Sequence, residues 1–169
     1  MENILSKRLY QFPAKIKILC FITILNLTIG VSVGLYYVYY TTQISIDGTT
    51  EHFRGSAIDN DFSIPEKYPK PLSELLNTTH THILSMTFIF LIIGSIFYFN
   101  SIITGFLKTF LIIEPFISIS ITFGGIWLVR FIHPVFSYLI IISGILMYVS
   151  FFLMAVTIYY ELAIKKTSS

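Results

Sequence analysis

The sequence predicts an all-α integral membrane protein, a four-helix bundle with one long extracytoplasmic loop between its first and second helices. Hydrophobic residues make up 54% of the 169 residues and charged residues only 12%, with a mean hydropathy of +0.77. That composition is too apolar for a water-soluble globule. The apolar residues also form four runs long enough to cross a bilayer, and a polar interval separates the first run from the rest.

The four apolar runs predict a single membrane domain over residues 1–169. We expect its spans at about residues 18–40, 83–99, 106–131 and 135–160. The bulky end of the first run, Tyr36 to Tyr40, offers no small-residue cleavage site, so this run should stay as an anchor. Asn26, Gly30 and Gly34 recur every fourth residue on it, which predicts a helix-packing face. Short turns join the later runs and make neighbouring helices antiparallel.

The polar interval, at about residues 41–79, holds six of the nine carboxylates and three of the six prolines. A structureless connection of this length is uncommon, so part of it should fold against the mouth of the bundle. Pro71 can start a short helix through Leu76, whose three leucines share one face and would lie on the membrane surface. This helix would deliver the chain to His80, at the edge of the second span.

The distribution of Lys and Arg predicts the orientation. Seven of these residues fall on the side of the two termini and four on the side of the long loop. Cytoplasmic segments carry the excess of positive charge, so both termini should be cytoplasmic. The net charge of +2 is small and forms no basic stripe, so we expect no nucleic-acid partner. The single cysteine, Cys20, excludes an intramolecular disulfide.

With this orientation all four histidines fall on the outer side, at one rim of the bundle: His52, His80, His82 and His133. Neutral imidazole is a common ligand for Zn and Cu, so the rim is a candidate metal site. His80 and His82 lie about 200° apart on a helix, so both bind one ion only if the helix begins after His80. If Thr78 or Thr79 instead caps the helix, His82 shares a face with Met86, a soft ligand that favours Cu(I).

Three other interpretations compete with a metal site. A haem with an axial histidine suits a four-helix bundle, although no histidine lies deep in a span. Proton or quinone chemistry at the membrane surface would use Glu51, His52 and Arg54. In the structural interpretation the histidines form hydrogen bonds with the loop backbone, and the threonines at the start of the helix cap it. Arg54 and Arg130 pair with nearby carboxylates. No motif of a nucleophile with its base or of a phosphate loop supports an enzyme.

Glu114 stands out because it falls well inside the third span. An ionised carboxylate there costs at least a few kcal/mol, so we expect it to be protonated, paired, or closer to the interface than the hydropathy suggests. Pro115 follows it directly and frees a backbone carbonyl, which favours a polar contact at this place.

Four segments carry a resemblance to a known family: Thr50 to Gly55, Pro69 to Leu76, Thr79 to His82, and Trp127 to Arg130. Their order resembles a family of small, uncharacterised bacterial inner-membrane proteins with E-H-x-R-G and T-H-x-H segments. The chain departs from that pattern with Tyr68 and Pro71, where Phe and Ser are expected. The resemblance implies a location in the bacterial inner membrane and a single joint site. It disfavours His133 and Glu114 as members of that site. The residues of that site are Glu51, His52, Arg54, Lys70, Glu74, His80 and His82.

The sequence therefore predicts a membrane protein whose outer rim binds a transition metal (Cu or Zn) or haem, as a non-catalytic accessory of a respiratory or metal-handling system. In this prediction His52, His80 and His82 bind the metal, and Glu51, Arg54, Lys70 and Glu74 complete the site. The alternative is a cofactor-free structural or assembly subunit of a membrane complex. Its predicted partners are the lipid bilayer and another membrane protein.

Overall fold

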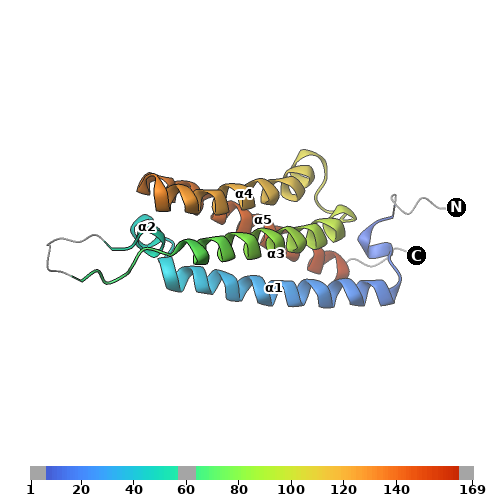
Figure 1. The fold of residues 1–169 in the computed structure, drawn as a ribbon. Coiled ribbons are helices and arrows are strands. Elements are labelled where there is room, and N and C mark those ends of the chain that lie inside the picture. Colours follow the sequence, from blue (N-terminus) through green and yellow to red (C-terminus); the bar gives the residue numbers. More distant parts are fainter. Residues whose placement is uncertain (1–6, 57–63, 164–169) are drawn as a thin grey trace.

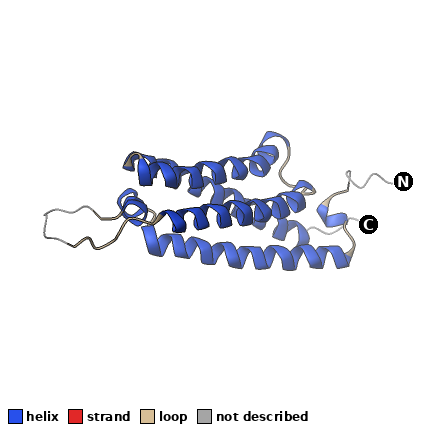
Figure 2. Ribbon diagram, in the orientation of Figure 1, coloured by secondary structure: helices blue, strands red, loops and turns tan. Residues whose placement is uncertain are grey.

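The computed structural model describes residues 7–56 and 64–163, and in this part of the chain all regular structure is helical (Figures 1 and 2). Four helices are long and apolar enough to cross a membrane: α1 (Ala14–Thr42), α3 (Leu72–Tyr98), α4 (Gly105–Phe131) and α5 (Ser137–Ala163). The predicted fold class, an all-α membrane bundle, is confirmed.

The four long helices lie side by side, with α1 and α4 on opposite sides of the bundle and α3 and α5 between them (Figure 1). The short helix α2 (Ile46–Arg54) packs across the ends of α4 and α5. We call the end of the bundle that carries α2 the rim end. The first residues of α1 and the last of α5 lie at the opposite end, which we call the terminal end (Figure 1).

The core lies among α3, α4 and α5. Phe90, Phe97, Ile119, Phe151 and Met154 are almost completely buried there. Helices in lipid associate through close packing and hydrogen bonds rather than through the hydrophobic effect, so this interdigitated core is what holds the three helices together.

By contrast, α1 is mostly exposed. It packs against α2 and α5 and touches α3 only slightly. The predicted packing face on α1 is only partly used within the chain. Asn26 is exposed and a Cβ added to Gly30 would meet nothing within 4 Å, whereas a Cβ added to Gly34 would lie 3.9 Å from Tyr148 Oη of α5.

One predicted boundary differs from the structure. The apolar run predicts a span from about 83, yet α3 begins at Leu72 and continues without a break. The predicted short surface helix after Pro71 is therefore the first part of α3. Asn77, Thr78 and Thr79 are weak helix formers but not helix breakers, and each side chain is free to bond the preceding turn. His80 and His82 consequently both lie inside a helix.

The connection from α1 to α2 is a tight turn. Gln43 and Ile44 both adopt the left-handed conformation, with φ of 52° and 50°. This conformation is unusual for a β-branched residue such as Ile44 and requires support from its surroundings. Thr42 Oγ1 accepts a hydrogen bond from Ile44 N at 3.2 Å, and Ser45 caps α2 by accepting from Gly48 N at 3.0 Å. Part of the long loop thus folds against the bundle, as expected.

The terminal end is closed by polar and apolar contacts. The Glu161 carboxylate is buried and accepts hydrogen bonds from Asn100 Nδ2 at 2.6 Å and Ser101 N at 2.8 Å. Leu9, on a short 3-10 helix (Leu9–Gln11), is fully buried, and its backbone N–H donates to Phe99 O at 2.9 Å. These contacts tie the α3–α4 turn to the end of α5 and to the segment before α1.

Candidate functional site

A cavity of about 950 Å³ lies on the α1 side of the bundle, enclosed by α1, α2, α3, α4 and α5 and partly open to its surroundings. We call it the lateral cavity. It exists because α1 stands away from α3, and because Gly34 and Gly144 present no side chain to it. Along α5 its lining runs from Ile140 to Val156, which is roughly 24 Å of helix. The cavity therefore follows the bundle for much of the thickness of a bilayer core.

The lining of the lateral cavity is polar at one end. Most of its wall is apolar, with residues such as Val33, Phe123 and Leu153. Most of its polar and charged residues gather at the rim end, where they come from α1, α2, the segment before α3, and α3: Thr41, Thr42, Thr49, His52, Lys70, Glu74, Thr78 and His82. A space with this distribution suits a molecule that has a hydrocarbon part and a polar head.

His52, Lys70 and Glu74 line both the lateral cavity and a second, smaller pocket of about 350 Å³. The remaining lining of the smaller pocket comes from residues 67–71. Lys70 Nζ and the Glu74 carboxylate form an ion pair one helical turn apart. These three side chains therefore separate the apolar cavity from a pocket at the rim surface, where they can contact molecules on either side.

His52 has a depressed pKa. Burial of the imidazole is the main cause, because it disfavours the charged form, and the ammonium groups of Lys70 and Lys67 lower the pKa further. The Glu74 carboxylate acts in the opposite direction. His52 is thus neutral at neutral pH and offers one nitrogen as a hydrogen-bond donor and one as an acceptor.

His82 lines the lateral cavity, whereas His80 does not. The Thr78 carbonyl can only accept, so its 2.9 Å contact with His82 Nδ1 assigns the proton to that nitrogen and leaves Nε2 as an acceptor. The His82 ring lies 5.4 Å from the ring of Phe123. Met86, one turn further on, also lines the cavity. Neither expected start of the helix, after His80 or at a Thr78 or Thr79 cap, is found, because α3 begins at Leu72; His82 and Met86 nevertheless both line the cavity, as the second geometry expected.

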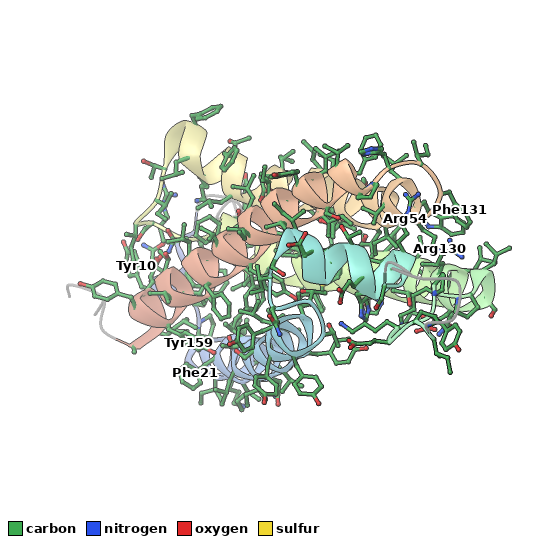
Figure 3. All side chains as sticks on the ribbon, turned by 90° about the vertical axis from the view of Figure 1, so that its left-hand side faces the viewer. Tyr10, Phe21, Arg54, Arg130, Phe131 and Tyr159 are labelled. Carbon is green, nitrogen blue, oxygen red and sulfur yellow. The ribbon has the colours of Figure 1, made fainter. Side chains whose placement is uncertain are left out.

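Arg54 and Arg130 hold backbone at the rim, and within the described part of the chain neither forms an ion pair with a carboxylate. Arg54 Nη1 donates to Val129 O at 3.4 Å, and Arg130 Nε donates to Lys70 O at 3.1 Å. The two arginines and Phe131 gather at one edge of the rim (Figure 3). Glu51 is paired with Lys67 at 3.2 Å, away from the lateral cavity. Arg54 and Arg130 therefore fix α2 and the loop to α4 through backbone carbonyls, whereas the structural interpretation expected them to pair with carboxylates.

Two further hydrogen bonds attach the rim to the helices. Trp127 Nε1 donates to Thr79 Oγ1 at 2.9 Å and joins α4 to α3. The hydroxyls of Thr50 and Ser137 lie 2.9 Å apart and join α2 to α5. Trp127, Thr79 and Thr50 all lie in the segments that carried the family resemblance, and the structure gives them positions as links between elements.

The predicted metal or haem site finds no support in this geometry. Among the described residues, no group of three or more His, Cys, Asp or Glu side chains is placed to hold a metal ion. His80 and His82 are separated by their positions on one continuous helix, and only His82 faces the cavity. His133 Nδ1 is occupied by Val135 N at 3.2 Å. Of the predicted site residues, the structure brings together His52, Lys70, Glu74 and His82, and it leaves out Glu51, Arg54 and His80.

Sequence reasoning missed the residues that create the cavity. Gly34, Gly144, Thr122 and Tyr148 line it, together with apolar residues of α1 and α5. Their types are ordinary in membrane helices, so no local pattern marks them. The cavity arises from the space between α1 and α3, which depends on how the helices are arranged and leaves no mark in the sequence.

Comparison with known proteins yields one match. A family model described as a transmembrane helical domain matches residues 43–169. The match begins directly after α1 ends at Thr42, and it includes α2, α3, α4 and α5. No curated protein and no solved structure matches the chain.

Proposed function

Because the chain belongs to the Aq_1264_TM family of transmembrane helical domains, and because that domain and α1 together enclose the lateral cavity, we propose that the protein binds a membrane-soluble amphipathic molecule there. The polarity of the cavity carries this proposal: an apolar space at membrane depth that ends in charged and hydroxyl side chains. The hydrocarbon chain of the ligand occupies the space between α1 and α5, and its polar head lies among His52, Lys70, Glu74 and His82.

The head of the ligand meets groups of both charges. Lys70 offers an ammonium group and Glu74 a carboxylate, neutral His52 offers imidazole nitrogens, and the His82 ring also lines this end of the cavity. A head that carries both hydrogen-bond donors and acceptors satisfies these groups better than a purely apolar end would. The second pocket beyond them gives the head a route to the rim surface.

The distribution of Lys and Arg supports a placement of the rim end on the extracytoplasmic side, with both termini in the cytoplasm. In this placement, in a bacterial inner membrane, the ligand enters sideways from the lipid and presents its head outward. The protein serves as a carrier or holder of a lipid-like molecule, and no reaction is assigned to it.

Filling the cavity tests the proposal. A Cβ added to Gly144 would meet nothing within 4 Å, and Gly144 lines the cavity, so Gly144→Phe should occupy the ligand space without disturbing neighbouring side chains. Gly124 also has open space around it but lies outside the cavity lining, on α4, so Gly124→Phe is the matched control.

We would reconstitute the three proteins in nanodiscs with a photoactivatable diazirine phospholipid and locate the adducts by mass spectrometry. The proposal expects adducts on cavity-lining residues of wild type and Gly124→Phe that Gly144→Phe removes. Mass spectrometry of organic extracts from the purified wild type should identify the natural ligand. Equal labelling of all three proteins would contradict the proposal and favour the alternative, a cofactor-free structural or assembly subunit.

A further inference from the structure

A second polar site lies inside the bundle, between α4 and α5. The Glu114 side chain is 5% exposed, and both of its carboxylate oxygens accept hydrogen bonds from serine hydroxyls. Ser118 Oγ, one turn along α4, donates to Oε1, and Ser150 Oγ of α5 donates to Oε2 at 2.7 Å. This arrangement gives the carboxyl group partners but no opposite charge.

The position of these serines places Glu114 well inside the apolar helices, one helical turn from the midpoint of α4. Ser118 is the midpoint of α4 (Gly105–Phe131), and Ser150 is the midpoint of α5 (Ser137–Ala163). An ionised carboxylate at this depth costs at least a few kcal/mol, and such residues mark ion pathways and proton relays in membrane proteins. Among the described residues no cation forms an ion pair with Glu114, so a proton is the simplest charge to neutralise it.

The titratable and charged groups on the helices packed around Glu114 lie elsewhere along these helices. On α3 and α4 they are Glu74, His80, His82, Tyr98, Lys108 and Arg130, and on α5 they are Tyr138, Tyr148, Tyr159, Tyr160 and Glu161. None of them forms a recorded hydrogen bond with the Glu114 carboxyl, which is bonded by Ser118 and Ser150.

The surroundings of Glu114 differ toward the two ends of the bundle. Toward the rim end, Thr122 lies one further turn along α4, its hydroxyl is 2.6 Å from that of Ser143, and Thr122 lines the lateral cavity. Toward the terminal end, the buried residues of α4 and α5 are apolar until Glu161: Leu111, Met154 and Ile158, each at most 2% exposed, and Ala155. Hydroxyl groups therefore lie between Glu114 and the cavity, one helical turn apart along α4, and apolar packing separates Glu114 from the opposite end.

We propose that Glu114 is a proton-exchanging site that is reached only from the rim end, through the lateral cavity. In the protonated state the carboxyl O–H becomes the donor in the hydrogen bond with Ser118. The proton passes to the Ser118 hydroxyl as that hydroxyl gives its own proton to water that enters the cavity from the rim, past Thr122, so Ser118 stays neutral. The carboxylate keeps the negative charge until a proton returns by the same route. This site goes beyond ligand binding and does not require that the cavity hold a lipid.

Access is tested by cysteine reactivity, since Cys20 is the only cysteine in the chain. In a Cys20→Ser background, Thr122→Cys reports the rim-side path and Met154→Cys the apolar side. With a small water-soluble thiosulfonate added to nanodiscs, Thr122→Cys should react at a rate well above that of Met154→Cys. Reaction at both positions, or at neither, would overturn the one-sided path.

Protonation is tested with dicyclohexylcarbodiimide, an apolar reagent that modifies protonated carboxyl groups in membranes. Mass spectrometry should find the adduct on Glu114 of the wild type, with a yield that falls as the pH of the medium rises. Glu114→Gln, which keeps the size of the side chain, should lose this adduct. A yield at Glu114 that is zero, or that does not change with pH, would contradict proton exchange while leaving the proposed ligand untouched.

Discussion

The helices α1 and α4 are both apolar enough to span a membrane but have opposite roles in the bundle. In the most apolar 18 residues of each, 50% are buried in α4 and only 11% in α1. α4 belongs to the part of the chain matched by the family model, and α1 precedes that part. The difference teaches that hydropathy identifies a span but not its neighbours. α4 builds the core and holds the polar site at Glu114, whereas α1 forms one wall of the lateral cavity.

The largest difference between α1 and α4 should appear when the same substitution, Ile to Ala, is made in both helices. Ile119 of α4 is 2% exposed and Ile29 of α1 is 55% exposed. Ile119→Ala should lower the free energy of unfolding by about 2 to 5 kcal/mol, because it leaves a cavity among packed side chains. Ile29→Ala should change it by less than about 0.5 kcal/mol. Denaturation with dodecyl sulfate in mixed micelles measures both, and similar losses would contradict the contrast.

A second pair tests close packing by adding atoms. A Cβ on Gly125 of α4 would lie 2.9 Å from Ile140 Cγ1 of α5, whereas a Cβ on Gly30 of α1 would meet nothing within 4 Å. Gly125→Val should destabilise the protein by about 1 to 3 kcal/mol through overpacking. Gly30→Val should leave thermal stability close to wild type. If Gly30→Val were as damaging, the exposed face of α1 would be in contact with another protein or copy.

A smaller effect should appear at the rim, with pH. Burial depresses the pKa of His52 below 6.5, and Lys70 and Lys67 add to the effect while Glu74 opposes it. Above 6.5 the imidazole is neutral in both folded and unfolded chains. Below it the unfolded chain takes up a proton that the folded protein resists, so stability should fall as pH decreases from 6.5 toward the folded pKa.

The comparison of wild type with His52→Gln isolates this contribution. Melting temperatures recorded from neutral pH down to about pH 5 should decline more steeply for the wild type, because glutamine does not titrate in this range. Parallel curves for the two proteins would show that His52 is not the group responsible.

The smallest expected effect concerns the attachment of α1. Thr28 Oγ1 of α1 lies 3.2 Å from Tyr159 Oη of α5, and the Tyr159 ring also packs against Phe21 (Figure 3). Tyr159→Phe keeps the ring and removes the hydrogen bond, so it should cost about 0.6 kcal/mol, the usual size of such bonds in membranes. A loss of several kcal/mol would mean that α1 is held much more firmly than its exposure indicates.

The sequence predicted the spans because long apolar runs have few other uses, and it predicted the folding of part of the loop from the loop's length. The helix that carries the second apolar run begins at Leu72, eleven residues before the predicted start of the span, since Asn77 to His82 is polar yet compatible with a helix that extends beyond the lipid. At the rim, residue type and topology indicated His52 and His82, and the family resemblance added Lys70 and Glu74. Among the described residues no group of metal ligands forms, because His80 and His82 lie on the continuous helix α3. A local sequence pattern does not show where such a helix begins.

In the interior of the bundle, the sequence predicted single residues but not their contacts between helices. The unusual position of Glu114 and its neighbour Ser118, four residues on, are readable from the sequence. Ser150 is 36 residues away on another helix, so its hydrogen bond to Glu114 required the three-dimensional arrangement. The lateral cavity is likewise a property of helix spacing, with Gly34 and Gly144 as its least conspicuous contributors.

The apolar packing of Leu111, Met154 and Ile158 below Glu114 also has an electrical consequence. A charge that crosses a whole membrane gains or loses about 2.3 kcal/mol per 100 mV. A proton that moves from the rim to Glu114, one helical turn beyond the midpoint of α4, crosses more than half of that field, so its binding energy should shift by about 1.5 kcal/mol per 100 mV. The occupancy of Glu114 would then follow the voltage of the membrane as well as the acidity of the medium at the rim.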